Sequence, residues 1–307
     1  MEVSVLGEAV IRTHKLTKWY GKHRGVIELD LEVRQGEVLG YLGPNGAGKT
    51  TTIRLLLDFL RPTAGRAEVF GLDPRRDSIE IRRRTGYLPG ELALYGNLTG
   101  QEFLRYAARL RGGVDWDFTH GWAERLKADL SRPIRTLSHG NKQKIGLIQA
   151  FMHRPSLLIL DEPSSGLDPL IQHEFYRMVA EAKAEGRTVL LSSHNLPEVE
   201  RVCDRVGIIR DGRLLTVEGV ASLKERSLRR LEIHFASAPN SGVLAGVSGV
   251  QDVEVADGGI LRCTVRGSLD PLVKALARFE VINLVSHEPT LEEVFMAYYG
   301  GDLKHAG

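Results

Sequence analysis

The chain has 307 residues, of which 42% are hydrophobic, so it has room for about two domains, and wholesale disorder is excluded. Its 41 lysines and arginines against 39 aspartates and glutamates give a net charge of +2, which argues against a dedicated nucleic-acid binder. No apolar run reaches the roughly 18 residues of a membrane span, and no signal-peptide pattern opens the chain, so we expect a cytoplasmic protein.

The first predicted elements are a strand, a second strand, a glycine-rich turn and a helix. Apolar residues alternate with acids over 28–33, as in a strand with one buried face. Residues 38–42 are almost all apolar, which is typical of a strand buried on both faces, and 51–60 has the pattern of a helix. A strand, a glycine turn and a helix in this order form the first half of a βαβ unit.

The middle of the chain is predicted to be helical and then to alternate between helices and strands. Helical patterns dominate from about residue 92, where Thr99 and Glu102 fit a capping box ahead of a helix over 103–110. The elements that follow are helix 142–153, strand 156–160, helix 169–184, strand 188–191, and strands 206–210 and 213–216, joined by Asp211-Gly212 as a hairpin.

After about residue 221 the sequence changes in character. Residues 223–230 are charged and indicate a linker or a short helix. The elements expected beyond them are strand 231–235, a hairpin across 257–259, helix 271–279, strand 281–285, and a helix opened by the capping box at 290–293. We therefore divide the chain into a larger domain, 1–222, and a small α+β domain, 223–307.

Residues 43–50 match the phosphate-loop pattern G-x-x-x-x-G-K-[ST]. The matching residues are Gly43, Pro44, Asn45, Gly46, Ala47, Gly48, Lys49 and Thr50. Glycines allow backbone N–H groups to point at phosphate oxygens, and the positive end of the following helix favours the same anion. In such loops Lys49 reaches the β- and γ-phosphates and the Thr50 hydroxyl binds Mg²⁺. The pattern predicts a phosphate-binding loop, and a glycine-rich turn with an incidental lysine is the alternative.

Asp161 and Glu162 follow the apolar strand that ends at Leu160. Open α/β sheets bind ligands at the carboxyl ends of their strands, so an acid pair here is well placed. We expect Asp161 to hold Mg²⁺ and Glu162 to orient and deprotonate the attacking water. Neighbouring strand residues point to opposite faces, so these two roles require the strand to end at this pair.

Three further segments make the pattern specific: Leu137 to Asn141, Ser164 to Asp168, and His194 after the strand at 188–191. In this order the motifs resemble the nucleotide-binding subunit of an ATP-binding cassette (ABC) transporter over roughly residues 10–218. The resemblance implies an α/β fold: a P-loop NTPase (RecA-like) core with an antiparallel β subdomain and a helical subdomain at about 92–153. The small C-terminal α+β domain lies outside it.

The resemblance also implies a role for each matching residue. Tyr20 would stack on adenine and Thr51 would join the ATP site; His194 would contact the γ-phosphate. The signature loop is Ser138, His139, Gly140 and Asn141, and in the family it caps the γ-phosphate bound to the partner subunit. Asp168 would touch the opposite site. A simple helix cap is the alternative explanation for Ser138 and for Asp168.

Two departures from the family pattern stand out. Glycine, Gly90, occupies the position of a usual glutamine after the strand that ends at 86–89, so either the adjacent Glu91 or water must serve there. In the signature loop, His139 and Asn141 replace glycine and glutamine, whereas Ser138 and Gly140 are retained. We expect ATP binding to survive both changes.

By this resemblance the protein is an Mg²⁺-dependent ATPase that forms a homodimer when ATP is bound, and it sits on the inner face of the membrane through a separately encoded permease. The ending at 288–295 resembles exporters of the drug and antibiotic-resistance (ABC-2) type. The alternatives are a non-transport ATPase of this family and an ATP-dependent conformational clamp on another cytoplasmic partner. A P-loop kinase or GTPase is disfavoured because it has no use for the segment 137–141. No nucleic-acid partner is expected.

Overall fold

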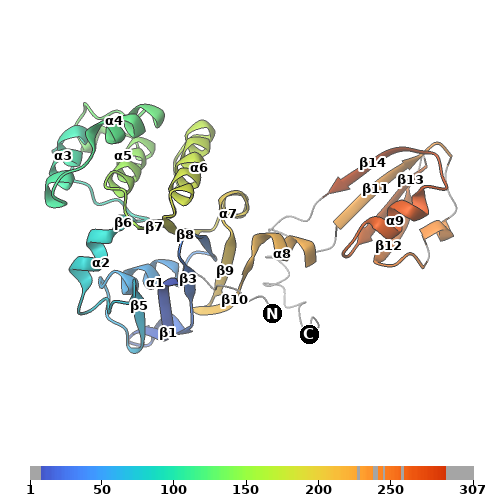
Figure 1. Ribbon diagram of the computed structural model, residues 1–307, viewed down its shortest axis with the longest axis horizontal. Coiled ribbons are helices and arrows are strands. Elements are labelled where there is room, and N and C mark those ends of the chain that lie inside the picture. Colours follow the sequence, from blue (N-terminus) through green and yellow to red (C-terminus); the bar gives the residue numbers. More distant parts are fainter. Residues whose placement is uncertain (1–7, 227–228, 238–240, 245, 257–258, 288–307) are drawn as a thin grey trace. The chain divides into compact units, whose positions relative to one another are not determined.

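The computed structural model describes residues 8–226, 229–237, 241–244, 246–256 and 259–287 (Figure 1). The chain divides into two compact units, with the boundary between Val217 and Glu218. None of the helices in the described ranges is both long and apolar enough to cross a membrane. Cys203 in the first unit and Cys263 in the second are buried and free.

A six-stranded sheet lies at the centre of the first unit, with strand order β10-β9-β4-β8-β7-β6. In chain order its strands are β4 (Val38–Leu42), β6 (Thr85–Leu88), β7 (Leu157–Asp161), β8 (Thr188–Ser193), β9 (Arg205–Arg210) and β10 (Arg213–Gly219). Strands β4, β7 and β8 are buried along their whole length, as their apolar sequences predict. The strands from β9 to β6 run parallel, so their carboxyl ends meet at one edge.

The connections between these strands contain α1 (Lys49–Leu56), α2 (Ser78–Arg84), α6 (Pro169–Ala184) and α7 (Leu196–Val202), and a longer helical segment lies between β6 and β7. Helix α6 has the predicted bounds. Helix α1 begins at the phosphate-loop lysine and ends before residue 60, because Asp58 takes a left-handed backbone conformation that stops the helix. The β9–β10 turn at Asp211 and Gly212 has positive φ at both residues, as the predicted hairpin requires.

A second, antiparallel sheet contains β1 (Ala9–Tyr20), β2 (His23–Leu29), β3 (Glu32–Arg34) and β5 (Ala64–Val69). The prediction of one strand over 28–33 was wrong. The chain crosses from one edge of β1 to the other at Asp30 and Leu31, where Lys15 N–H donates to Asp30 Oδ1 and Leu31 N–H donates to Thr13 Oγ1. The predicted alternation of buried apolar and exposed acidic side chains over 28–33 still holds on both sides of this crossing, because the apolar residues of the segment are buried.

The predicted helical segment forms α3 (Gly100–Leu110), α4 (Trp116–Arg125), a 3₁₀ turn (Ile134–Thr136) and α5 (His139–Phe151). The capping box at the start of α3 is present in both directions: the Thr99 hydroxyl accepts from Glu102 N–H, and the Glu102 carboxylate accepts from Thr99 N–H. Helix α5 begins three residues before the predicted start at 142, directly after its cap Ser138. The signature loop therefore lies at the amino end of α5.

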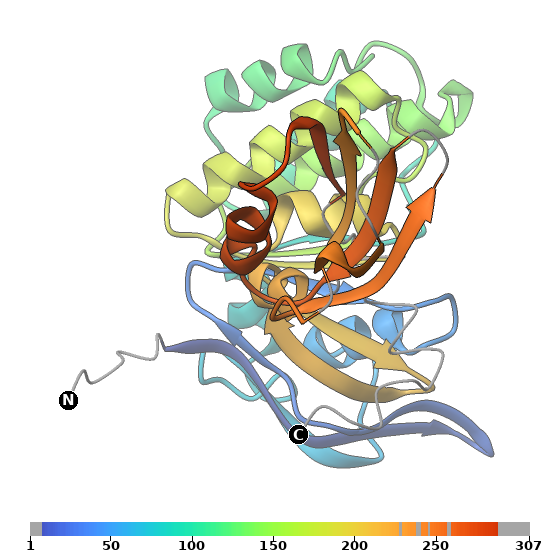
Figure 2. The same ribbon diagram turned by 90° about the vertical axis from the view of Figure 1, so that its right-hand side faces the viewer.

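The second unit begins with α8 (Val220–Arg226), so the charged segment is a short helix that leads into β11. Its antiparallel sheet has the order β12-β13-β11-β14, from β11 (Arg229–Phe235), β12 (Val250–Ala256), β13 (Ile260–Val265) and β14 (Val281–His287) (Figure 2). A 3₁₀ turn (Ser241–Leu244) follows β11, and α9 (Asp270–Leu276) follows β13. This sequence of elements is that of a split βαβ fold in which a single 3₁₀ turn replaces the first helix.

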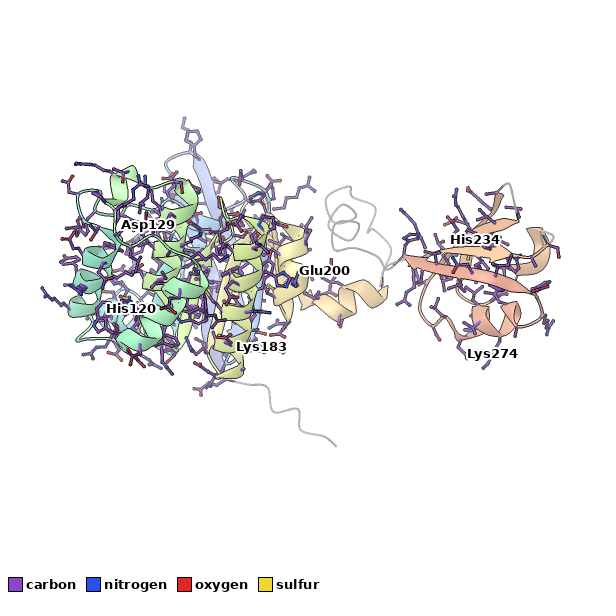
Figure 3. The ribbon with its side chains drawn as sticks, turned by 90° about the horizontal axis from the view of Figure 1, so that it is seen from above. His120, Asp129, Lys183, Glu200, His234 and Lys274 are labelled. Carbon is purple, nitrogen blue, oxygen red and sulfur yellow. The ribbon has the colours of Figure 1, made fainter. Side chains whose placement is uncertain are left out.

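One face of this sheet packs under α9, in a core of nine buried residues among those described. Figure 3 shows His234 and Lys274 on opposite sides of the sheet. The predicted hairpin is confirmed by the pairing of β12 with β13, although residues 257 and 258 of its turn lie outside the described residues. The helix predicted from Thr290 and the exporter-like tail also lie outside them.

Candidate active site

The phosphate loop connects β4 to α1, and two of its glycines are required by the surrounding chain. Gly48 has φ of +113°, and a Cβ there would lie 2.8 Å from the carbonyl oxygen of Gly25. A Cβ at Gly43 would lie 2.4 Å from the carbonyl oxygen of Ile209. Side chains are therefore excluded at both positions, and the loop keeps the curled backbone that exposes N–H groups at the start of α1.

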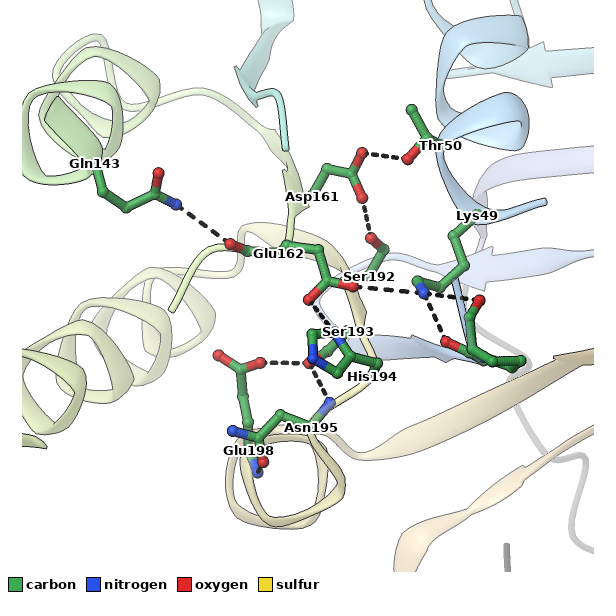
Figure 4. Close-up of polar contacts among 12 residues, drawn as sticks. Lys49, Thr50, Gln143, Asp161, Glu162, Ser192, Ser193, His194, Asn195 and Glu198 are labelled. Carbon is green, nitrogen blue, oxygen red and sulfur yellow. Dashed lines mark hydrogen bonds and ion pairs between the residues drawn. The ribbon is translucent and has the colours of Figure 1, made fainter. Parts of the chain in front are cut away.

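Lys49 is buried, with 6% of its side chain exposed, and its ammonium group lies inside the loop. Nζ donates to the carbonyl oxygens of Gly43 at 2.5 Å and Pro44 at 3.3 Å. It also lies 3.4 Å from Glu162 Oε1 (Figure 4). The loop thus holds a positive charge in place beside an acid, and a bound anion would compete for that charge.

Thr50 and Asp161 meet at the carboxyl end of β7. Thr50 Oγ1 donates to Asp161 Oδ2 at 2.7 Å, and Ser192 Oγ at the end of β8 donates to Asp161 Oδ1. The Asp161 carboxylate is 1% exposed. A hydroxyl and a carboxylate that converge beside a phosphate loop are hard oxygen donors, which fits Mg²⁺. The two residues predicted to bind the metal are therefore brought together.

Glu162 follows directly, and its backbone turns away from the strand. Its φ is +50°, a left-handed conformation that costs a non-glycine residue about 1–3 kcal/mol. The turn releases the side chain from the alternation of β7, so Asp161 faces Thr50 while Glu162 faces Lys49 and His194. The strand ends where the acid pair requires it to end.

His194 lies at the end of β8, with Nδ1 2.8 Å from Glu162 Oε2. The turn that carries it is tightly bonded: Asn195 N–H donates to Ser193 Oγ at 2.9 Å, and Ser193 Oγ donates to Glu198 Oε2 at 2.6 Å. Glu198, in α7, is buried, and this burial raises its pKa. His194 is 62% exposed, so its ring remains open to solvent.

Tyr20 lies at the end of β1, and 41% of it is exposed. Its hydroxyl is 3.5 Å from Thr51 Oγ1 in α1, and the ammonium of Lys18 lies 5.5 Å from its ring centre. The contact with Thr51 connects the ring to the helix of the phosphate loop. Both residues, predicted as part of the ATP site, are therefore close together.

The signature loop does not join this cluster within the chain. Ser138 caps α5 by accepting from Asn141 N–H at 3.3 Å, and the Asn141 side chain exchanges two hydrogen bonds of 2.8 Å with the backbone of Asp129. Asp168 caps α6 by accepting from Ile171 N–H at 3.0 Å. Among the described residues, no hydrogen bond or ion pair links Ser138 or Asp168 to the phosphate loop.

His139 and Gly140 of the signature loop both lie against Gly166. A Cβ on Gly166 would be 2.3 Å from His139 Cδ2, and a Cβ on Gly140 would be 2.5 Å from the Gly166 carbonyl oxygen. Glycine at both 140 and 166 permits this close approach of the two backbones. The signature loop and the loop at 164–168 are therefore in direct contact within one chain.

Gly90 lies beside the metal-site carboxylate. A Cβ on Gly90 would be 3.3 Å from Asp161 Oδ2, whereas the Glu91 side chain is exposed. The negative charge of Asp161 also acts on the nearby Tyr87. Burial, together with this charge, raises the pKa of Tyr87 to about 12. No side chain at position 90 contacts Asp161, so Thr50 and Ser192 are the side chains hydrogen-bonded to it in the described part of the chain.

Four residues of the site were not found from the sequence: Ser192, Ser193, Glu198, and Gln143, whose Nε2 donates to the carbonyl oxygen of Glu162 at 3.2 Å. The two serines end the apolar strand β8, and this change from apolar to polar was a usable signal. Gln143 and Glu198 stand in helices at positions that become buried, and they carry no motif of their own.

Comparisons with known proteins agree with this geometry. A model of the ABC transporter family matches residues 26–165. The bacitracin transport ATP-binding protein BcrA of Bacillus licheniformis is 36% identical over 299 residues, covering 95% of this chain and 98% of that protein. BcrA of Enterococcus faecalis is 32% identical over 300 residues, covering 96% and 97%. A solved ATP-binding subunit of an ABC transporter superposes with a TM-score of 0.65 at 31% identity, covering 70% of this chain and 92% of the other.

Proposed function

The chain belongs to the ABC transporter family of ATP-binding proteins, and on that basis we propose that it is the ATP-hydrolysing subunit that drives a separate membrane permease, an exporter of a drug-like or hydrophobic compound. The observation that carries the ATPase is the meeting of Lys49, Thr50, Asp161, Glu162 and His194 at the carboxyl ends of β4, β7 and β8. Export is supported by the similarity to bacitracin transport proteins over nearly the whole chain.

In this proposal the phosphate loop (43–50) binds the ATP phosphates through backbone N–H groups and through Lys49. ATP would displace the bonds that Lys49 now makes to Gly43 and Pro44. Tyr20 stacks on adenine, and Thr51 supports that end of the site. Thr50 and Asp161 hold Mg²⁺, which when bound neutralises charge on the phosphates.

Glu162 is the proposed general base. It accepts the proton of the attacking water, and the buried Lys49 ammonium lies 3.4 Å from its Oε1. His194 holds the carboxylate through Nδ1, and its exposed ring is available to the γ-phosphate. Hydrolysis therefore depends on positioning and on charge, since the protein forms no covalent bond to the phosphoryl group.

The site is complete only when two copies meet. Ser138, His139, Gly140 and Asn141 lie at the amino end of α5, where N–H groups favour an anion, yet they make no contact with the phosphate loop of their own chain. We propose that they cap the ATP of a second copy in a homodimer, with Asp168 beside the opposite site. Contact through Gly166 would move the two loops together.

We further propose that residues 1–222 form the ATP-binding domain and 223–307 an accessory α+β domain. The division of the fold near Val217 supports a boundary in this region. The protein would work on the inner face of the membrane, held there by its permease. We propose no nucleic-acid partner, because the net charge of the chain is small.

The test is an ATPase assay of the purified protein alone and with the permease in membrane vesicles. Turnover that requires Mg²⁺, disappears in Lys49→Ala and rises when the permease is present supports the proposal. Binding of ATP without turnover in either setting would contradict it and favour a conformational clamp.

A further inference from the structure

Glu162 keeps its left-handed backbone because bonds fix it on both sides. Its N–H donates to the carbonyl oxygen of Ser192 at 3.0 Å, and its own carbonyl oxygen accepts from Ser165 N–H at 3.2 Å. The same carbonyl oxygen accepts from the side-chain Nε2 of Gln143 at 3.2 Å. Strained conformations persist where the surroundings over-determine them, and such residues cluster at active sites. The direction of the Glu162 carboxylate therefore depends on these bonds.

Gln143 is the member of this set that comes from outside the strands and their turns. It stands in α5, is 1% exposed, and donates a second bond to the carbonyl oxygen of Pro163 at 3.0 Å. Figure 4 shows its first bond, to the carbonyl oxygen of Glu162. Its Oε1 is buried without a partner in the described part of the chain. A buried amide with one unpaired oxygen is unfavourable, so a purely structural position would be better filled by an apolar side chain.

Helix α5 connects Gln143 to the signature loop. Ser138 caps the helix, and Gln143 lies five residues later, so both belong to one rigid element. The same helix touches the loop at 164–168 through Gly140, whose Cα lies against the Gly166 carbonyl. A displacement of α5 must therefore displace the backbone of Glu162, because two bonds from one amide group tie them together.

We propose that Gln143 is a positioning residue for ATP hydrolysis, which ties the helix carrying the signature loop to the backbone of Glu162. The proposal rests on the function assigned above, since it takes Glu162 as the base. When the signature loop engages the partner's ATP, α5 is fixed, and through Gln143 the Glu162 of the same chain is fixed as well. Each site thereby senses whether the other is occupied.

Among the described residues, no hydrogen bond links Gln143 to the phosphate loop, so its loss should affect turnover and leave ATP affinity unchanged. We expect Gln143→Leu to lower kcat about 10- to 100-fold, since a displacement of about 1 Å at the reacting group has effects of this size. The concentration of ATP that half-saturates the monomer should stay the same. The Hill coefficient for ATP should fall toward one.

The decisive experiment is a double-mutant cycle with Glu162→Gln, measured as phosphate release from radiolabelled ATP. If Gln143 acts through the Glu162 carboxylate, Gln143→Leu should cause no further loss in the Glu162→Gln protein. An equal loss in both backgrounds would overturn the inference. A normal rate in Glu162→Gln alone would instead overturn the assignment of the base.

A matched control is Gln172→Leu. Gln172 in α6 donates its Nε2 to the carbonyl oxygen of Leu167 at 3.1 Å, so the change removes the same kind of bond from a neighbouring loop. Gln172→Leu should change the rate by the same factor in the Glu162→Gln protein as in the wild type. If Gln143→Leu does not fold, Gln143→Asn keeps the amide but shortens its reach, and it should show the same lack of additivity; additive losses would refute the proposal.

Discussion

Replacing Glu198 with glutamine should remove a penalty on folding stability that grows with pH. The Glu198 side chain is 1% exposed, at the start of α7. Oε2 accepts from Ser193 Oγ, and the Ser164 hydroxyl also favours the charged carboxylate, whereas Oε1 is buried without a partner in the described residues. Burial is the largest influence and raises the pKa of Glu198, and the two serine hydroxyls counter it only in part.

The sign and size of the effect follow from this arrangement. Because the pKa is higher in the folded state, the folded protein binds more protons between the two pKa values, and its stability falls as pH rises through that interval. Glutamine does not ionise. An unpaired buried oxygen of an ionised group costs at least about 1–3 kcal/mol, so the variant should gain up to about that much relative to the wild type as the pH rises past the raised pKa of Glu198 in the folded state.

Thermal unfolding followed by tryptophan fluorescence measures this change, because Trp122 is buried in the same unit. A gain of 1 kcal/mol corresponds to about 2–4 °C for a unit of this size. The control is Glu102→Gln: the Thr99 backbone bond lowers the pKa of Glu102, so its contribution is lost as pH falls and the slope has the opposite sign. A difference between Glu198→Gln and the wild type that stays constant with pH would refute the reasoning.

Three further predictions concern the nucleotide site and the signature loop. Lys49→Ala should weaken ATP binding about 10- to 100-fold, the value of one charge-assisted bond, in a titration with a fluorescent nucleotide; unchanged affinity would contradict its role. Tyr20→Ala should weaken binding about 5- to 150-fold while Tyr20→Phe keeps it, because stacking needs the ring and not the hydroxyl; equal losses would argue for the bond to Thr51. Asn141→Ala should lower the free energy of unfolding by about 1–3 kcal/mol in a urea titration, since two bonds to Asp129 are lost, and wild-type stability would show that these bonds contribute nothing.

The sequence predicted the structure correctly wherever residues close to one another in the chain determine it. Helix α6 begins and ends where its cap Asp168 and its pattern predicted, and the capping box of Thr99 and Glu102 forms as expected. The phosphate loop was found because its residues form one contiguous motif between a strand and a helix. The apolar runs of β4 and β7 were found because full burial demands apolar residues throughout.

The pairing between strands that lie far apart in the sequence could not be predicted from short sequence patterns. Strand β1 is shared by three partners and pairs with each through irregular registers, so its sequence shows no clean alternation, and it was missed. The break between β2 and β3 depends on Thr13 and Lys15 in β1, which lie far away in the sequence. For the same reason Gln143 could not be linked to Glu162, because their contact exists only once α5 packs beside the end of β7.

Gly90 separates this site from the usual pattern of its family, and the structure narrows what can replace the missing glutamine. Glu91 is exposed, and its side chain makes no hydrogen bond or ion pair in the described part of the chain, so it does not take over the contact with Asp161. A side chain at position 90 would begin 3.3 Å from Asp161 Oδ2, in the direction of the carboxylate. Because glycine has no side chain, water can occupy the space beside the Asp161 carboxylate, and water is an ordinary ligand of Mg²⁺. Any signal that reaches Asp161 from this loop must therefore pass through backbone and solvent, whereas α5 reaches the neighbouring Glu162 directly, through the bond from the Gln143 side chain to the Glu162 carbonyl oxygen.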